Sequence, residues 1–258
     1  MTAQTLTLAD ATVRRIGLGT NRLTNTPANQ EFVRQALAAG LNHIDTAHLY
    51  TAGESEATIG SALGGAHAGC VVATKGGYEP GTGRPDVLRG QIEESIGRLR
   101  AGAIDLYYLH RVHPDTPLED SLAVIAEQHD AGRIRHVGVS AVSVEQIERA
   151  RRIVPVAAVQ NRYNLADREY DDVVDYCAAE GIVFVPYYPL HGADGAVAAE
   201  IAGRHGASVN QIALAWLLRR SPAMLPIPGT LSLDHLRENL GALEIELTDA
   251  EFAELSQL

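Results

Sequence analysis

Short apolar stretches alternate with longer amphipathic stretches along almost the whole chain. Each apolar stretch has four to six residues and is rich in Val, Ile, Leu or Tyr. Near-continuous apolar runs of this length are typical of strands covered on both faces, as in a parallel sheet. The pattern therefore predicts eight strands, at residues 15–19, 41–45, 70–74, 104–109, 134–139, 156–160, 182–186 and 224–227.

The stretches between these strands carry signals of helix ends. Thr26 followed by Pro27 predicts a helix start, because a Thr side chain caps free N–H groups and Pro tolerates the first helical position. Gly40 is predicted to end that helix, and Thr116 with Pro117 repeats the start signal. Capping-box spacing, with Gln or Glu three residues after the cap, occurs at Ser143, Ser208 and Thr248.

An eightfold strand–helix alternation in 258 residues predicts an α/β fold, a (β/α)8 TIM barrel, which often takes about 250 residues as one domain. The first fourteen residues are expected to form a hairpin before the barrel. One of the helical stretches 196–205 and 209–219 is an extra helix, and 248–257 is another. Without a visible linker, residues 1–258 are predicted to be one domain. A doubly wound open sheet is the alternative.

Composition and charge narrow the classes of partner. Hydrophobic residues make up 46% of the chain and the formal net charge is -11, so a nucleic-acid ligand is not expected. The sequence has no apolar run of about 20 residues and no charged leader, which predicts a cytoplasmic protein without membrane contact. Cys70 and Cys177 are expected to be reduced and buried. A barrel completed within one chain favours a monomer.

Protonable side chains follow several of the predicted strands. Asp45, Tyr50, Lys75 and His110 fall where a barrel places its active site, at the carboxyl ends of strands. A phenol is a poor acid at neutral pH, but a nearby ammonium such as Lys75 would lower its pKa. Asp45 would keep Lys75 charged, and His110 would orient a substrate oxygen. The set predicts proton donation to a carbonyl.

Each of these residues alone also fits an ordinary structural role. Asp45 resembles a helix cap, Tyr50 a half-buried aromatic, and Lys75 a solvated charge. His110 next to an apolar strand fits a core histidine, and with His113 it forms the best candidate metal pair. No Cys or carboxylate cluster joins that pair at a metal-ligand spacing, so no metal site is predicted. The joint placement of the four residues on successive strands favours catalysis.

At these residues the chain resembles the aldo-keto reductase superfamily. HIDTAHLYTAGESEATIG at residues 43–60 resembles the family's signature, VVATKGG resembles its Lys strand, and DLYYLH resembles its His strand. RHVGVSA, VQNRYN and PIPGTLSLDHLRENLGAL match three further family segments. The assortment is most similar to bacterial members with short loops, including members that act on pyridoxal-like aldehydes.

The resemblance implies a barrel that reduces aldehydes and ketones with NADPH, or less often NADH. Tyr50 would be the general acid, tuned by Lys75 and Asp45, and His110 would orient the carbonyl. Ser140 and Gln160 would hold the nicotinamide carboxamide, Tyr187 would stack on the ring, and Glu238 and Asn239 would contact adenine. The full set implied to bind the cofactor is Gly19, Thr20, Asn21, Asp45, Ser140, Gln160, Tyr187, Tyr188, Pro189, Leu190, Ile227, Pro228, Gly229, Thr230, His235, Arg237, Glu238 and Asn239.

The chain departs from the family at several of these positions. Ala141 stands where many members have Asn, and Tyr188 stands where many have a serine beside the pyrophosphate. Gly229 and His235 stand where some members place Lys and Arg against the 2′-phosphate. Thr230, His235 and Arg237 remain as candidates to contact that phosphate, so NADPH is still expected, with NADH as the alternative.

The mouth of the site is expected to include Arg22, His48, Tyr78, Arg111 and Arg162. Three arginines near one rim favour a polar or anionic carbonyl substrate, unless they point into solvent or pair with acidic residues. Two other functions remain open at this point. One is a cofactor-binding sensor on the same scaffold. The other is a phosphate-substrate enzyme in which Lys75 forms a Schiff base.

Overall fold

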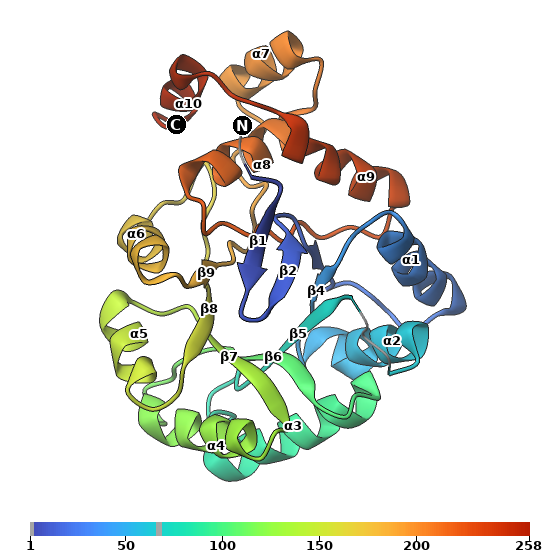
Figure 1. Ribbon diagram of the computed structural model, residues 1–258, viewed down its shortest axis with the longest axis vertical. Helices are drawn as coiled ribbons and strands as arrows, with labels where there is room; N and C mark the ends of the chain where they lie inside the picture. The colour runs from blue at the N-terminus through green and yellow to red at the C-terminus, as the bar shows by residue number, and fades with distance from the viewer. Residues whose placement is uncertain (1–2, 66–68) are drawn as a thin grey trace.

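The computed structural model describes residues 3–65 and 69–258, and its core is a curled parallel sheet surrounded by helices (Figure 1). Seven strands are hydrogen-bonded in the order of the sequence, and every neighbouring pair is parallel. The strands are β3 (Leu18–Gly19), β4 (His43–Asp45), β5 (Val71–Gly76), β6 (Ile104–Leu109), β7 (Ile134–Ser140), β8 (Val156–Gln160) and β9 (Val183–Phe184).

The segment 224–227 closes the barrel, although it is not a regular strand as predicted. Leu225 N donates to Phe184 O at 2.9 Å on one side, and Gly17 N donates to Pro226 O at 2.9 Å on the other. Bridges also join Phe184 to Met224 and Gly19 to Gly229. Proline lacks an N–H and therefore cannot donate to a strand ladder, so Pro226 and its neighbour Pro228 reduce the eighth strand to separate contacts. This closure excludes the open doubly wound sheet and confirms the eight-unit barrel.

The helices that follow the strands form the outer ring, and most begin where the sequence predicts. Thr26 accepts a hydrogen bond from Asn29 N at 3.2 Å, and the helix then ends before Gly40. The three predicted capping boxes are present at Ser143, Ser208 and Thr248. The outer helices are α1 (Pro27–Ala38), α2 (Glu54–Leu63), α3 (Pro85–Leu99), α4 (Leu118–Asp130), α5 (Val144–Arg151) and α6 (Asp171–Glu180).

The start of α4 differs from the prediction. Thr116 does not cap this helix, and its hydroxyl donates to Asp115 Oδ1 at 3.2 Å. Pro117 has an extended backbone and precedes the helix, which begins at Leu118. Pro117 therefore occupies the N-cap position, and Thr116 lies one residue too early to cap the helix.

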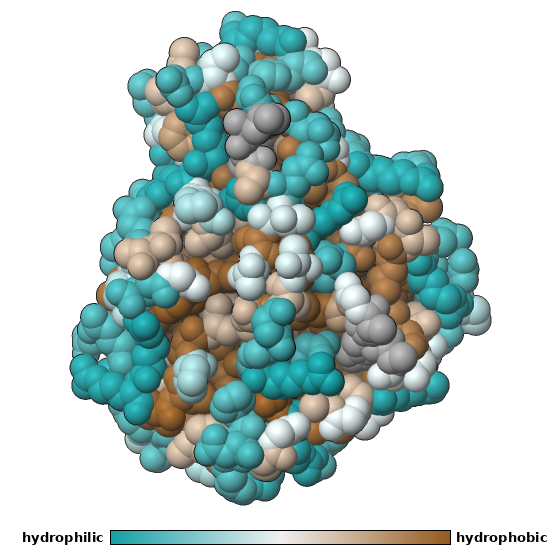
Figure 2. Space-filling model, in the orientation of Figure 1, coloured by the Kyte–Doolittle hydropathy of each residue, from teal (hydrophilic) through white to brown (hydrophobic). Residues whose placement is uncertain are grey.

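A hairpin of β1 (Thr5–Leu8) and β2 (Ala11–Arg14) covers one end of the barrel, as predicted (Figure 1). Leu8 and Val13 of the hairpin belong to one buried cluster with barrel residues such as Leu106. On this face, hydrophobic residues show in the furrows around the hairpin while hydrophilic residues cover most of the rim (Figure 2). The hairpin thereby leaves the carboxyl ends of the strands as the open end.

The remaining helices gather at one side of the barrel (Figure 1). They are α7 (Ala196–His205), α8 (Val209–Arg220), α9 (Leu233–Gly241) and α10 (Asp249–Leu255), and the extra helices lie where they were predicted. Cys70 and Cys177 are buried free thiols, which confirms the expectation of reduced cysteines. Among residues 3–65 and 69–258, no helix combines the length and the apolar character needed to cross a membrane.

Candidate active site

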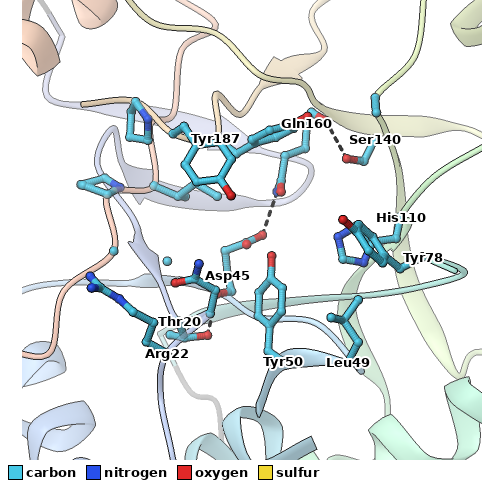
Figure 3. Close-up of a pocket in the computed structure, with 18 of the residues that line it drawn as sticks. Thr20, Arg22, Asp45, Leu49, Tyr50, Tyr78, His110, Ser140, Gln160 and Tyr187 are labelled. Carbon is cyan, nitrogen blue, oxygen red and sulfur yellow. Dashed lines mark hydrogen bonds between the residues drawn. The ribbon is translucent and has the colours of Figure 1, made fainter. Parts of the chain in front are cut away.

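A cavity of about 630 Å³ opens at the carboxyl ends of the strands (Figure 3). Its walls come from all parts of the barrel, as the topology requires of residues that end parallel strands. The lining residues are Gly19, Thr20, Asn21, Arg22, Asp45, Leu49, Tyr50, Tyr78, His110, Arg111, Ser140, Ala141, Gln160, Tyr187, Tyr188, Pro189, Leu190, His191, Ile227, Pro228 and Gly229.

A buried ion pair lies at the base of the cavity. Lys75 Nζ donates to Asp45 Oδ1 at 2.5 Å, and the two side chains are only 0% and 2% exposed. Lys75 Nζ also donates to Thr46 O at 2.8 Å, and Gln160 Nε2 donates to Asp45 Oδ2 at 2.8 Å. Burial lowers the pKa of Lys75, but Asp45 and Tyr50 together outweigh burial and raise it. Lys75 is therefore a fixed ammonium, which disfavours the Schiff-base alternative because that reaction needs a neutral amine.

The Tyr50 phenol points into the cavity between Asp45 and His110 (Figure 3). Lys75 Nζ lies 5.2 Å from the centroid of the Tyr50 ring. Burial raises the pKa of Tyr50, and Lys75 lowers it by less, so the pKa of the phenol lies above its ordinary value. Lys75 lowers the pKa of the phenol as predicted, but burial raises that pKa by more. The phenol accordingly holds its proton at neutral pH.

His110 borders the same space from the end of β6. Its ring centroid lies 6.1 Å from that of Tyr50 and 4.7 Å from that of Tyr78. Burial, then Lys75 and Arg111, hold the pKa of His110 well below its usual range. His110 Nδ1 is buried and has no hydrogen-bond partner among the residues that the structure describes. A neutral imidazole keeps one N–H donor, which is what orienting a carbonyl oxygen requires.

Ser140 and Gln160 lie side by side at the ends of β7 and β8 (Figure 3). Ser140 Oγ donates to Gln160 O at 2.7 Å, and the Gln160 amide donates to Asp45. Both residues predicted to contact the nicotinamide carboxamide therefore line the cavity. The Ser140 hydroxyl proton is bonded within the protein, and the Gln160 amide uses one of its two N–H groups on Asp45. Gln160 also links this wall to the buried ion pair.

Two residues at the wall have left-handed backbone conformations, Ala141 with φ +55° and Tyr188 with φ +53°. These are the same positions at which the chain departs from the family pattern. Asn164 Nδ2 donates to Tyr188 O at 3.1 Å and holds this backbone in place. The Tyr188 ring is 62% exposed at the cavity mouth. Non-glycine residues rarely adopt this region, and such residues concentrate at functional sites.

Two residues expected at the mouth are paired with acidic side chains, although the Arg162 guanidinium lies 5.8 Å from the centroid of the Tyr188 ring. His48 Nε2 pairs with Glu94 Oε2 at 2.8 Å, and Arg162 Nε pairs with Asp167 Oδ2 at 2.9 Å. Neither His48 nor Arg162 lines the cavity. The other residues of the expected mouth, Arg22, Tyr78 and Arg111, do line it.

The residues implied to hold the adenosine end also lie outside this cavity, in the segment 230–239. Glu238 accepts a hydrogen bond from Ser208 Oγ, and Arg237 lies 3.5 Å from Asp234 on an exposed face. Thr230, His235 and Asn239 make up the rest of the set. Of these, Thr230 and Asn239 are buried.

Leu49 and His191 line the cavity and were missed by the sequence reasoning. Leu49 directly precedes Tyr50, so its position next to the proposed acid was the available signal. His191 follows the Tyr187 segment by only a few residues. Among the described residues, no group of three His, Cys, Asp or Glu side chains is placed to hold a metal ion.

The sequence profile of the Aldo/keto reductase family matches residues 15–199 and 194–258. The chain belongs to the aldo-keto reductase family. It is 38% identical to an uncharacterized oxidoreductase of Schizosaccharomyces pombe, over 99% of this chain and 90% of the relative. It is 34% identical to pyridoxine 4-dehydrogenase of Escherichia coli, over 96% of each. A solved aldo-keto reductase from Klebsiella pneumoniae in complex with NADPH aligns with a TM-score of 0.88 and 29% identity, over 100% of this chain and 95% of that chain.

This aldo-keto reductase is an oxidoreductase that reduces an aldehyde or ketone to an alcohol, with NADP(H) as its nicotinamide cofactor. The cavity fits such a cofactor in size, since small-molecule sites span about 300–1,000 Å³. Its wall at Gly19 and Gly229 is bare backbone. A Cβ at Gly19 would lie 2.7 Å from Ile227 O, so this close approach of two backbones requires glycine.

Proposed function

We propose that Tyr50 donates the proton that the carbonyl oxygen takes up as it becomes an alcohol. The raised pKa of Tyr50 keeps the phenol protonated before the reaction. Lys75, 5.2 Å from the ring, stabilises the phenolate that remains, and Asp45 holds Lys75 in place. When bound, the reduced nicotinamide supplies the hydride that adds to the carbonyl carbon. The observation that carries this proposal is the convergence of Tyr50, His110 and the Lys75–Asp45 pair at one end of one cavity.

His110 has a different task in this proposal. His110 is a neutral donor whose ring centroid lies 6.1 Å from that of Tyr50. It orients the same carbonyl oxygen and does not compete with that oxygen for the Tyr50 proton. Proton transfer from a positioned side chain contributes about 10²–10⁴ to the rate. The product of this step is an alcohol, a phenolate at Tyr50 and an unchanged His110.

The cofactor is proposed to lie along the wall from Gln160 to Gly229. Ser140 and Gln160 would hold the carboxamide, and the half-buried Tyr187 offers a flat face to the nicotinamide ring. Arg22 reaches the side of the cavity opposite His110, next to Thr20 (Figure 3), which places a cation where the phosphates would run. Residues of the segment 230–239 would hold the adenosine end beyond the cavity.

The substrate is proposed to carry an anionic group near Arg111. This guanidinium lies 5.1 Å from the centroid of Tyr78, which in turn lies 4.7 Å from His110. Within the described part of the chain, no acidic side chain pairs with Arg111, unlike Arg162. In a protein of net charge -11, an unpaired cation this close to the reacting groups favours a carboxylate or phosphate on the substrate.

A reductase assay tests the reaction. Purified protein is mixed with NADPH and a panel of aldehydes and ketones that includes pyridoxal, and the absorbance at 340 nm is followed. The proposal expects loss of absorbance that depends on the carbonyl compound. Tight NADPH binding with no turnover on any carbonyl would instead support a sensor, and trapping of a substrate on Lys75 by borohydride would support the Schiff-base enzyme.

A matched pair of aldehydes tests the substrate charge. With Arg111→Gln, the KM for 4-carboxybenzaldehyde should rise about tenfold or more, as expected for the loss of a hydrogen bond to a charged group. The KM for the uncharged methyl ester of that aldehyde should stay within twofold. Arg89→Gln is the control, because Arg89 does not line the cavity and pairs with Glu127 at 2.8 Å on the surface. Equal effects on both aldehydes would contradict an anion site at Arg111.

Because the barrel closes on itself within one chain, we propose a single catalytic domain that acts as a monomer. Sedimentation at micromolar concentration should give one species of 27.6 kDa.

A further inference from the structure

The turn that follows Tyr50 has an unusual backbone. Thr51, Ala52 and Gly53 have φ values of +48°, +55° and +88° in succession. Left-handed conformations are unfavourable for residues other than glycine, and most of all for a β-branched residue such as Thr51. Such a run persists only where the surroundings hold it. The direction of the Tyr50 side chain therefore depends on the contacts of this turn.

Arg98, at the end of α3, makes several of those contacts. Its Nη1 donates to His48 O at 3.1 Å, two residues before Tyr50. Its Nη2 donates to Glu94 Oε2 at 2.7 Å, and Glu94 also binds the His48 ring. The guanidinium lies against Gly53 so closely that a Cβ at that position would stand 2.5 Å from Arg98 Cζ. One planar group thus contacts the turn both before and after Tyr50.

Glu56 connects this guanidinium to the strand that carries Lys75. Arg98 Nη1 lies 3.3 Å from Glu56 Oε2, and the Glu56 side chain is 0% exposed. The other oxygen, Glu56 Oε1, accepts a hydrogen bond from Thr74 Oγ1 at 2.5 Å. Thr74 is the residue before Lys75 on β5. The chain of contacts therefore runs from the turn at Tyr50, through Arg98 and Glu56, to the strand of Lys75.

We propose that Arg98 and Glu56 are positioning residues that fix Tyr50 relative to Lys75. The proposal rests on the proposed role of Tyr50 as proton donor. Neither residue lines the cavity, so neither touches the substrate or the cofactor. The Arg98–Glu56 pair joins the His48 carbonyl to Thr74, the residue beside Lys75. A misplacement of about 1 Å in a reacting group can cost about 10² in rate.

The test uses the double variant Arg98→Met/Glu56→Gln. Removing both charges avoids a buried carboxylate without a partner, and the amide at position 56 can still accept from Thr74. Arg98→Lys is the second variant, because it keeps the cation beside Glu56 but not the planar fork. Arg89→Met is the matched control: Arg89 lies on the same helix and pairs with Glu127 at 2.8 Å on the surface.

Two measurements are made on each protein. In the steady state, kcat of the double variant should fall about tenfold or more, while the KM for the carbonyl and the Kd of NADPH stay within twofold. The kcat of Arg98→Lys should lie between that of wild type and that of the double variant. Without cofactor or substrate, backbone hydrogen exchange of residues 48–53 should be at least tenfold faster in the double variant, with the barrel strands unchanged. Arg89→Met should match wild type in both measurements.

A double variant with wild-type kcat would overturn the proposal, whatever its exchange or melting temperature. Unchanged exchange in residues 48–53 would overturn it equally. If the double variant does not fold, an Arg98→Lys protein with wild-type kcat and exchange would overturn the proposal. Hydrogen exchange needs no turnover, so a wild-type protein that reduces no carbonyl would refute the proposed function and still leave the contacts of the turn measured.

Discussion

The buried pair of Lys75 and Asp45 allows a prediction whose size follows from its geometry. The two charges meet at 2.5 Å with almost no exposure to solvent. Asp45→Asn leaves the ammonium with Thr46 O as its remaining close acceptor, and Lys75→Met leaves the carboxylate with the Gln160 amide. Removing one partner of a buried pair typically costs about 3–5 kcal/mol in the free energy of unfolding.

The double variant Asp45→Asn/Lys75→Met should cost less than the sum of the two single variants. The double variant leaves no unpaired charge. Its loss in free energy of unfolding should therefore be smaller than the sum of the two single losses by about 2 kcal/mol or more, within the range seen for residues in direct contact. Urea unfolding at pH 7 gives the free energy of unfolding of the three variants and of wild type, analysed with one common m-value. The pair also raises the pKa of Lys75, so its contribution is complete below the ordinary lysine value and is lost as pH rises through the folded-state pKa.

Additive costs within about 0.5 kcal/mol would refute this reasoning, because distant independent sites behave in that way. A single variant that loses less than about 1 kcal/mol would also refute it. Asp45→Glu is a control that keeps the charge and moves the carboxylate. It should preserve more stability than Asp45→Asn.

Two further predictions concern pH and the cofactor. Burial lowers the pKa of His43 to about 4, so the unfolded chain takes up a proton on the His43 ring at a higher pH than the folded protein does. About 3 kcal/mol of the free energy of unfolding should therefore be lost as pH falls from 6.5 to 4. Urea unfolding across that range should show a shallower loss for His43→Gln, and an unchanged slope would contradict the assignment. Fluorescence titration should give a lower dissociation constant for NADPH than for NADH, and equal or reversed constants would contradict the preference.

The barrel was predictable because it depends on patterns that are local in the sequence. Runs of four to six apolar residues form strands, and a Ser three residues before a Gln forms a capping box, as at Ser143 and Ser208. The eighth strand was predicted at the right position, but the segment forms separate contacts and not a regular strand. Pro226 and Pro228 lack the N–H groups that a regular ladder would use, so the apolar run alone does not form a strand there.

Placement of the candidate site was predictable where the strand itself fixes the side chain. Asp45 and Lys75 lie on paired neighbouring strands, and their ion pair follows from that register. His48 and Arg162 follow strands too, but their long or polar side chains turn to Glu94 and Asp167. The acidic partner of such a side chain depends on how the loops fold, and no local sequence pattern predicts that partner.

Tyr50 is proposed to give its proton to the carbonyl oxygen. Single-turnover reduction by Tyr50→Phe, with saturating NADPH, tests it most directly. Tyr78→Phe, which also lines the cavity beside His110, is the control. Tyr50→Phe should lose at least about a hundredfold in the rate of reduction, while its Kd for NADPH stays within twofold. A rate equal to that of wild type, with NADPH bound, would contradict it.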